Sequence, residues 1–306
     1  MIQHIDAPPP PIRHDRHSSS RAKTRQRILR STAVLPSLFT ICNGLAGFGA
    51  IHFSTRQALG EANLVDLRTA SILIFLAMVF DMLDGRLARF TRRTSDFGAQ
   101  LDSLCDMVSF GVAPAMLMVR TVIMAMRGQI ERLSFMPHAL VLERLVWGVA
   151  AVYLACTALR LARFNVENEP NESAHMHFSG LPSPGAASAV ASLVILFERL
   201  THFEAGWRSS VWLMCSVSLT LPVISLFAGL LMISRFRYSH VVNQYIRGRR
   251  PVGYIVKIVL IVLALFIEPF LTLALVTTGY ALSGPIVALR RRIRRDPQTL
   301  NQSIPK

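Results

Sequence analysis

Charged residues are scarce in this chain of 306 residues: they make up 17% of it, whereas 52% of the residues are hydrophobic. A soluble domain usually carries about 25% charged residues. Residues 211–234 contain no charge, and residues 258–289 contain only Glu268. Uncharged runs of about 18 residues or more are typical of membrane-spanning helices. The low charge and the long apolar runs therefore argue against a soluble protein.

Cysteine is also scarce, and its spacing excludes two classes of site. The four cysteines form no C-x-x-C pair and lie in or beside apolar runs, at Cys42, Cys105, Cys156 and Cys215. This pattern excludes a cysteine-rich zinc site and a disulfide framework. We interpret the four side chains as small apolar residues.

Acidic residues are outnumbered by Lys and Arg, 18 against 33, so the formal net charge is +15. The basic residues lie between the apolar runs, as juxtamembrane residues do. The chain lacks zinc-finger spacing and a basic groove interleaved with aromatic residues. We therefore expect the basic residues to contact membrane lipids and not nucleic acid.

Residues 1–32 lack the apolar core of a secretory signal, and we expect a basic, disordered cytoplasmic arm there.

The apolar runs predict the fold. Because only helices and closed barrels satisfy the backbone in lipid, we expect an all-α, polytopic transmembrane helical bundle. Length and hydropathy predict about eight spans, near residues 35–54, 69–90, 100–126, 139–162, 183–201, 209–234, 252–268 and 270–289. The last two spans are separated only by Glu268-Pro269, where proline can end or kink a helix.

These spans divide the chain into four segments. The predicted segments are a basic arm (1–32), a core of six spans (33–234), two further spans with a basic cytoplasmic connection (235–290) and a basic tail (291–306). With both termini in the cytoplasm, 25 of the 33 Lys and Arg residues fall in cytoplasmic segments. Because basic residues are enriched on that side, we expect cytoplasmic termini and an even number of spans.

Residues 80–111 hold four aspartates at the edge of apolar runs. Asp81 and Asp84 are three residues apart and share one helix face, and Asp102 and Asp106 are four apart and share another. A short polar turn joins the two helices, so they must be antiparallel neighbours. We expect their carboxylates to converge at the cytoplasmic membrane boundary.

Four clustered carboxylates need a cation, because like charges otherwise keep some of them protonated. Mg²⁺ and Mn²⁺ take oxygen ligands, and two such ions can clamp a phosphoryl group. Gly85, Ala88 and Gly98 leave room for a bulky phosphate-bearing ligand, and Arg89 can bind a phosphate through two parallel hydrogen bonds. A single aspartate of this kind could be a helix cap or half of a surface ion pair. Ionisable residues in membrane spans are rare, however, and are usually functional.

This stretch resembles the signature of the CDP-alcohol phosphatidyltransferases at every fixed position: Asp81-x2-Asp84-Gly85-x2-Ala88-Arg89-x8-Gly98-x3-Asp102-x3-Asp106. The resemblance implies a helical membrane enzyme, usually a homodimer, with a two-metal site for Mg²⁺ or Mn²⁺ that opens to the cytoplasm. It implies that Asp106 serves both as a metal ligand and as the catalytic base, and that the other metal ligands are Asp81, Asp84 and Asp102. It also implies a CDP-lipid pocket lined by Gly85, Ala88, Arg89 and Gly98, with Ser95 against the nucleotide.

Further segments resemble one branch of this family, the membrane-type phosphatidylserine synthases of bacteria and archaea. They are residues 35–43, 159–165, 178–184 and 280–285, so the resemblance covers roughly residues 33–290. It implies a multi-pass enzyme of the inner cell membrane that transfers the phosphatidyl group of CDP-diacylglycerol to L-serine. It also implies that Thr40 and Asn43 belong to the CDP-lipid pocket.

The residues themselves determine the acceptor less well than they determine the metal site. Arg160, Arg163 and Asn165 are our candidates for binding the serine carboxylate, although the two arginines could instead snorkel to lipid headgroups. Glycerol 3-phosphate or inositol phosphate stays open as the acceptor, because the arginines of residues 86–93 could bind the additional phosphate.

A cation transporter is the alternative from another class of protein. It would place the aspartates near the bilayer midplane, often in broken helices. Here they lie beside the basic residues 86–93, near a membrane boundary, which favours an enzyme.

Overall fold

The computed structural model describes residues 37–56, 64–91, 96–130, 138–167, 180–203, 211–236, 238 and 252–299, and the regular structure in these ranges is helical. The first helix covers residues 37–55. It is followed by α2 (Leu64–Thr91), the continuous run of α3 (Asp96–Asp106), η2 (Met107–Val112) and α4 (Ala113–Ile130), then α5 (His138–Glu167), α6 (Ser183–Phe203), α7 (Val211–Ile233), α9 (Val252–Ile267) and α10 (Pro269–Thr299). The all-α prediction is confirmed, and each predicted span overlaps one of these helices or continuous runs.

Among the described residues, five helices are long and apolar enough to cross a membrane. They are Phe97–Met126, Val141–Val166, Ser183–Thr201, Ser216–Ile233 and Pro269–Arg290. The chain is therefore a multi-pass membrane protein. The helix α2 does not belong to this set because Asp66, Arg68, Asp81 and Asp84 interrupt its apolar sequence.

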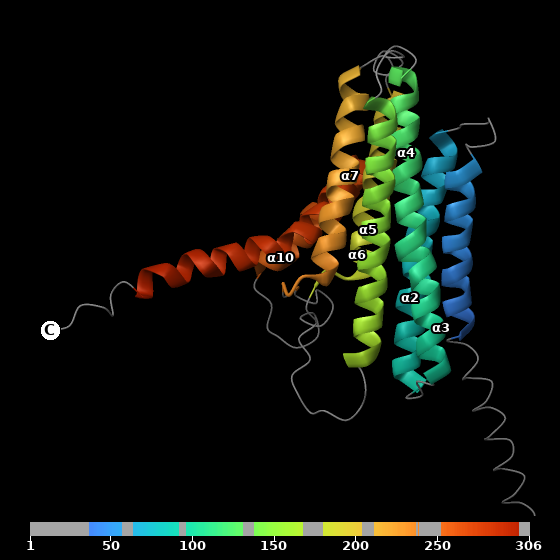
Figure 1. Cartoon of the computed structure of the whole chain (residues 1–306). Coiled ribbons are helices and arrows are strands. Elements are labelled where there is room, and N and C mark those ends of the chain that lie inside the picture. The colour runs from blue at the N-terminus through green and yellow to red at the C-terminus, as the bar shows by residue number, and fades with distance from the viewer. Residues whose placement is uncertain are drawn as a thin grey trace, which may run out of the picture.

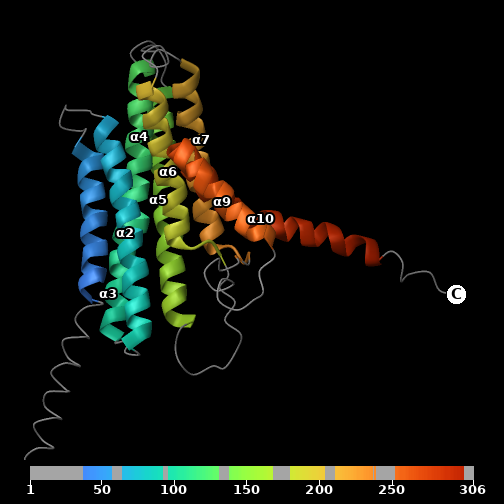
Figure 2. The same ribbon diagram turned by 180° about the vertical axis from the view of Figure 1, so that it is seen from behind.

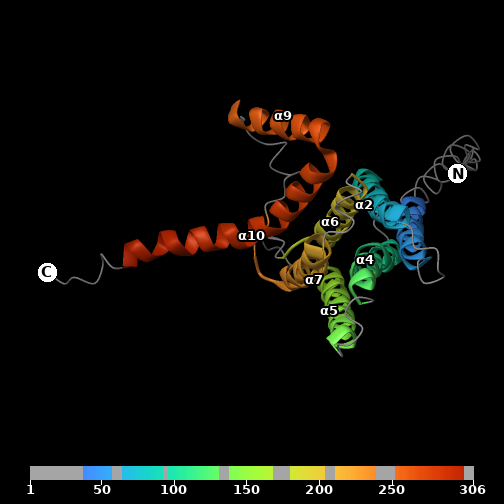
Figure 3. The same ribbon diagram turned by 90° about the horizontal axis from the view of Figure 1, so that it is seen from above.

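Most helices run side by side along one axis (Figures 1 and 2). The first helix and α2 form one edge of this bundle, and α4, α5, α6 and α7 complete it. In the view from above, α9 lies outside the bundle and packs on α10, which leaves the bundle beside α6 and α7 (Figure 3). Glu268-Pro269 does separate α9 from α10, as the sequence indicated.

The helix α10 ends at Thr299, so it extends beyond the predicted last span of residues 270–289. Arginine is a good helix former, so the basic sequence after residue 289 favours continuation of the helix. The part of the predicted tail from 291 to 299 is therefore helical. Residues 1–32 and 300–306 lie outside the described residues.

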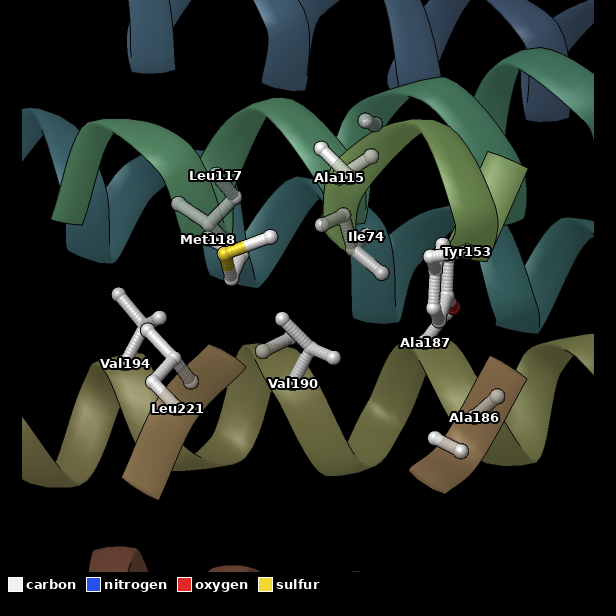
Figure 4. Close-up of a cluster of buried hydrophobic side chains, with 14 of the residues drawn as sticks. Ile74, Ala115, Leu117, Met118, Tyr153, Ala186, Ala187, Val190, Val194 and Leu221 are labelled. Atoms are coloured by element: carbon white, nitrogen blue, oxygen red, sulfur yellow. The ribbon is translucent and has the colours of Figure 1, made fainter. Parts of the chain in front are cut away.

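The centre of the bundle is apolar and closely packed (Figure 4). Fully buried side chains come from five helices, represented by Ile74 on α2, Met118 on α4, Tyr153 on α5, Val190 on α6 and Leu221 on α7. Small side chains such as those of residues 186 and 187 let the helices approach. Close van der Waals packing of this kind is what drives helix association in lipid.

Directly after Asp106, the third helical run changes to the π-helix η2. Pro114 has no N–H, so it cannot donate to the Phe110 carbonyl four residues earlier. The Tyr153 hydroxyl on α5 donates to that carbonyl at 3.1 Å. The π segment lies inside the predicted span 100–126, and Pro114 is its signal in the sequence. Such segments are frequent at functional sites.

A tyrosine hydroxyl also takes the place of a missing backbone N–H on α10, and it joins this helix to the segment after α7. Pro285 cannot donate to the Ala281 carbonyl, and the Tyr238 hydroxyl donates to it at 2.8 Å. Burial, with Tyr280 beside it, raises the pKa of Tyr238 to about 12, so this hydroxyl keeps its proton at neutral pH. A hydrogen bond of 2.7 Å between Ser192 and Thr277 joins α6 to α10 further along.

Candidate active site

Three carboxylates meet where the C-terminal part of α2 packs beside the last turns of α3. One oxygen of each of Asp81, Asp102 and Asp106 lies within 4.8 Å of the others, and Asp106 is buried. Asp84 is also buried and interacts electrostatically with all three. The four aspartates of the motif therefore lie together, with Asp84 beside the closest three.

The aspartate cluster has the properties of a divalent cation site. The Asp84 Oδ2 and Asp102 Oδ1 atoms are buried without a hydrogen-bond partner. Burying unpaired carboxylate oxygens costs free energy unless a positive charge compensates. A set of carboxylate oxygens suits hard cations such as Mg²⁺ and Mn²⁺. The residues present therefore fit a divalent cation.

The first helix supplies side chains that hold two of these aspartates. Asn43 Nδ2 donates to Asp106 Oδ1 at 2.8 Å. The Thr40 hydroxyl donates to Asp84, which also accepts from the backbone of Gly85. Thr40 and Asn43 are both buried. The first helix thus fixes the orientation of one carboxylate from α2 and one from the run that begins with α3.

Two glycines allow the first helix to approach so closely. A Cβ on Gly44 would lie 2.9 Å from Cys105 Sγ, and a Cβ on Gly47 would lie 2.6 Å from Ser109 Cα. Ser109 Oγ donates to the Asn43 carbonyl at 2.8 Å across this contact. Glycines three residues apart share a helix face, and small residues are enriched where membrane helices pack together. This spacing is the sequence signal for a contact that the motif alone does not predict.

Arg160 on α5 lies at the same end of the bundle. Its Nη1 donates to Ser183 Oγ at the start of α6, at 3.0 Å. Its guanidinium interacts electrostatically with Asp106 and Asp81. Its Nε is buried without a hydrogen-bond partner. Because guanidinium N–H groups form a fork that matches a carboxylate, Arg160 offers an unused donor near the aspartates.

The other two candidates on α5 are placed differently. Arg163 and Asn165 are exposed. Asn165 exchanges hydrogen bonds with Ser103 on α3, at 2.9 and 3.0 Å. Arg160 is therefore the candidate that the structure places beside the aspartates.

The predicted CDP-lipid pocket is described only in part. Among the described residues, no atom from outside the neighbouring backbone of α2 lies within 4 Å of a Cβ placed on Gly85, so there is room for a ligand at this position. Gly98 is half-buried on α3. The side chains of Ala88 and Arg89, and all of Ser95, lie outside the described residues.

Comparison with known proteins identifies the family to which this arrangement of residues belongs. The family model described as CDP-alcohol phosphatidyltransferase matches residues 33–222. The matched segment contains the four aspartates, the polar residues of the first helix, and Arg160 with Ser183. It ends before α9 and α10.

Three curated relatives carry the name CDP-diacylglycerol–serine O-phosphatidyltransferase. The protein from Mycobacterium leprae is 27% identical over 277 residues, which cover 90% of this chain and 80% of that protein. The protein from Helicobacter pylori is 30% identical over 207 residues, 68% of this chain and 72% of that protein. The protein from Mycobacterium bovis is 33% identical over 193 residues, 62% of this chain and 58% of that protein.

Proposed function

Because the chain belongs to the CDP-alcohol phosphatidyltransferase family, we propose that it transfers the phosphatidyl group of CDP-diacylglycerol to L-serine, releasing CMP. The observation that carries this proposal is the close approach of Asp81, Asp102 and Asp106, with a half-buried arginine at the same end of the bundle whose buried Nε–H has no hydrogen-bond partner. The names of the relatives from three species support serine as the acceptor.

The aspartate cluster would hold two divalent cations, either Mg²⁺ or Mn²⁺, with Asp81, Asp84, Asp102 and Asp106 as ligands. Bound cations supply neutralisation of the pyrophosphate and stabilisation of the departing CMP. The protein keeps these ligands in place through Thr40, which donates to Asp84. Removing metal with a chelator should abolish activity, and adding Mg²⁺ or Mn²⁺ should restore it. Full activity after exhaustive metal removal would exclude this role for the aspartates.

Asp106 is our proposed base, because it is buried and one of its oxygens is held by Asn43 at 2.8 Å. With Oδ1 fixed in this way, the Oδ2 atom has a defined direction for accepting the proton of the serine hydroxyl. Positioned proton transfer of this kind typically contributes 10²–10⁴-fold to a rate.

The nucleotide-lipid pocket would use the small residues of α2 and α3 together with two polar residues of the first helix. We assign to it Gly85, Ala88, Arg89, Ser95, Gly98, Thr40 and Asn43. The open space above Gly85 supports this assignment.

For the acceptor carboxylate we assign Arg160, with Arg163 and Asn165 as secondary candidates. The deciding experiment supplies purified enzyme with CDP-diacylglycerol and labelled serine, glycerol 3-phosphate or inositol phosphate in parallel. We expect label in lipid from serine alone. Incorporation from a phosphorylated alcohol, without incorporation from serine, would contradict the serine assignment and leave the transfer chemistry intact.

We also propose that the enzyme is a homodimer in the inner cell membrane, with the aspartates facing the cytoplasm. The asymmetric distribution of Lys and Arg supports this orientation. Single cysteines introduced at Arg13 and Arg294 should react with an impermeant reagent only from the cytoplasmic side. Labelling of the two positions from opposite sides would refute the even number of spans.

A further inference from the structure

Ser109 is a fully buried residue of η2, three positions after the last aspartate of the motif. Its Oγ donates to the backbone carbonyl of Asn43 on the first helix at 2.8 Å. The Asn43 side chain in turn donates from Nδ2 to Asp106 Oδ1, also at 2.8 Å. The continuous run of α3 and η2 therefore holds Asn43 at two points, its backbone through Ser109 and its side chain through Asp106.

Buried hydroxyls elsewhere in the bundle behave differently from that of Ser109. Three of them donate to the carbonyl four residues earlier in their own helix, at 2.9, 2.7 and 2.8 Å: Ser71, Thr121 and Ser225. Such a bond within one helix is the usual choice for a serine or threonine in a span. Ser109 reaches instead to another helix, so its hydroxyl fixes the first helix relative to η2.

The Asn43 amide depends on this backbone contact for its position. Asn43 is fully buried, and within the described part of the chain its Oδ1 atom has no hydrogen-bond partner. The amide is therefore oriented through its bond to Asp106 and through the backbone that carries it. A shift of the backbone at residue 43 would carry Nδ2 with it and turn the Asp106 carboxylate.

Ser109 is itself held on two sides. A Cβ on Gly47 would lie 2.6 Å from Ser109 Cα, so the backbones of the first helix and η2 are in direct contact. On the other side of η2, the Tyr153 hydroxyl donates to the carbonyl of Phe110, the next residue, at 3.1 Å. A hydroxyl fixed in this way can serve as a reference point for a side chain on a neighbouring helix.

We propose that Ser109 is a positioning residue for Asp106 and that it acts through Asn43. By fixing the backbone at residue 43, it sets the direction of the amide that binds Asp106 Oδ1. The other carboxylate oxygen, Oδ2, then keeps one direction for accepting the proton of the acceptor hydroxyl. This inference rests on the proposed function, because it takes Asp106 as the base.

The Ser109→Ala variant removes the hydroxyl and adds no atom to the contact with Gly47. Small displacements of a reacting group can lower a rate as much as about 10²-fold. We therefore expect kcat at saturating metal to fall about tenfold or more, whereas the KM for serine should stay within about threefold. The melting temperature in detergent, which should decrease slightly, shows that the variant is folded.

Ser71→Ala is the matched control, because it removes another fully buried serine hydroxyl, one that bonds within α2. It should lower the melting temperature slightly and leave kcat unchanged. A fall in kcat for Ser71→Ala as large as that for Ser109→Ala would overturn the inference, because any lost buried hydroxyl would then have the same effect.

A double-mutant cycle with Asn43→Ala separates positioning from helix packing. Asn43→Ala removes the amide that binds Asp106 but keeps the backbone carbonyl that accepts from Ser109. In this background, Ser109→Ala should still lower the melting temperature, because the hydrogen bond that it removes is still present. It should no longer lower kcat, because the amide through which it acts is gone. A purely structural role predicts the same fall in kcat in both backgrounds.

The outcomes distinguish the inference from the function on which it rests. A wild-type enzyme without transfer activity, or an Asp106→Asn enzyme with near-normal turnover, would overturn the function or its base and the inference with it. Where the wild-type enzyme is active and Asp106→Asn is not, an unchanged kcat in Ser109→Ala would overturn the inference alone. An equal fall in kcat with and without the Asn43 amide would also overturn it. A fall that disappears with the amide is the expected result.

Discussion

At the carboxylate end of the bundle, helices touch through glycine: a Cβ on Gly47 would lie 2.6 Å from Ser109 Cα. On α9, the opposite holds, since Phe266 is 88% and Ile267 is 67% exposed. Both regions are built from apolar helices. A helix that faces lipid needs only an apolar surface, whereas helices that enclose charges need small residues and polar partners. Close protein contact, and not hydropathy, therefore marks the part of this molecule that performs chemistry.

The helix α10 belongs to both regions, and it shows how they are connected. Thr277 and Tyr280 face α6, whereas Leu275 and Leu282 of the same helix are exposed. One helix thus contributes a face to the site end and a face to lipid. Substitutions that compare the two regions should have very different effects.

The largest effect is expected for Asp106→Asn. The amide keeps the size of the side chain and a carbonyl oxygen for Asn43, but it cannot take a proton at neutral pH. Turnover should fall about 10²-fold or more while CDP-diacylglycerol still binds. Asp81→Asn should instead weaken metal binding, and with it binding of the nucleotide lipid, because it removes ligand charge.

The control for Asp106→Asn is Glu268→Gln, the same acid-to-amide change at the exposed junction of α9 and α10. It should leave turnover unchanged. Steady-state kinetics at saturating metal and substrate provide the measurement. Near-normal turnover of Asp106→Asn under these conditions would show that the serine proton leaves by another route.

Gly47→Ala should have the next largest effect. Its Cβ would meet the Ser109 Cα, a backbone atom that cannot turn aside, so the first helix and η2 must separate. Overpacking of this kind typically costs about 1–3 kcal/mol. Activity should fall as well, because Asn43 would move away from Asp106. Thermal unfolding in detergent and the transfer assay measure the two effects.

Gly279→Ala on α10 is the counterpart of Gly47→Ala in the other region. In the part of the chain that the structure describes, no atom from outside the neighbouring backbone of α10 lies within 4 Å of a Cβ at that position. Alanine also has a higher helix propensity than glycine by about 1 kcal/mol. The variant should be neutral or slightly stabilised. Equal destabilisation by the two substitutions would contradict the difference in packing between the regions.

Tyr153→Phe tests whether the Tyr153 hydroxyl compensates for the backbone N–H that Pro114 lacks. Without the hydroxyl, the Phe110 carbonyl loses its donor in a fully buried place. An unsatisfied buried group typically costs about 1–3 kcal/mol. Tyr238→Phe should cost less, because Tyr238 keeps 8% of its surface exposed whereas Tyr153 has none. The melting temperatures of the two variants measure this difference, and a larger decrease for Tyr238→Phe than for Tyr153→Phe would contradict the ranking.

Much of the molecule could be predicted from the sequence, because lipid restricts the backbone to few solutions. The apolar runs predicted the helices, and the spacing of Asp81, Asp84, Asp102 and Asp106 predicted a shared site between two antiparallel helices. In the structure, one oxygen of each of Asp81, Asp102 and Asp106 lies within 4.8 Å of the others. These features depend on local periodicity and on short connections, which a sequence displays directly.

Contacts between distant helices could not be predicted in the same way. Nothing in the sequence indicates that Asn43 donates to Asp106 or that Tyr280 packs against Gly185, because these contacts depend on how separate helices pack. The π-helix after Asp106 follows from Pro114 and from Tyr153 together, and only the first of these is a local signal. Of three polar candidates on α5, helical spacing could not single out Arg160.

The smallest effect is expected for Phe266→Ala on α9. The ring is 88% exposed within one chain, so the substitution removes a contact with lipid and leaves no cavity inside the protein. Stability should change by less than about 0.5 kcal/mol. Phe110→Ala in η2, where the ring is fully buried, should cost about 3–5 kcal/mol by comparison.

The result of Phe266→Ala also bears on the proposed homodimer. If a second copy covers α9, Phe266→Ala should shift the monomer–dimer equilibrium toward monomer, which sedimentation in detergent would detect. If the Phe266→Ala variant stays dimeric with an unchanged melting temperature, the dimer contact lies elsewhere and α9 faces lipid. A large loss of stability in the monomer would contradict the comparison itself, because it would mean that an exposed apolar helix depends on its packing as the site does.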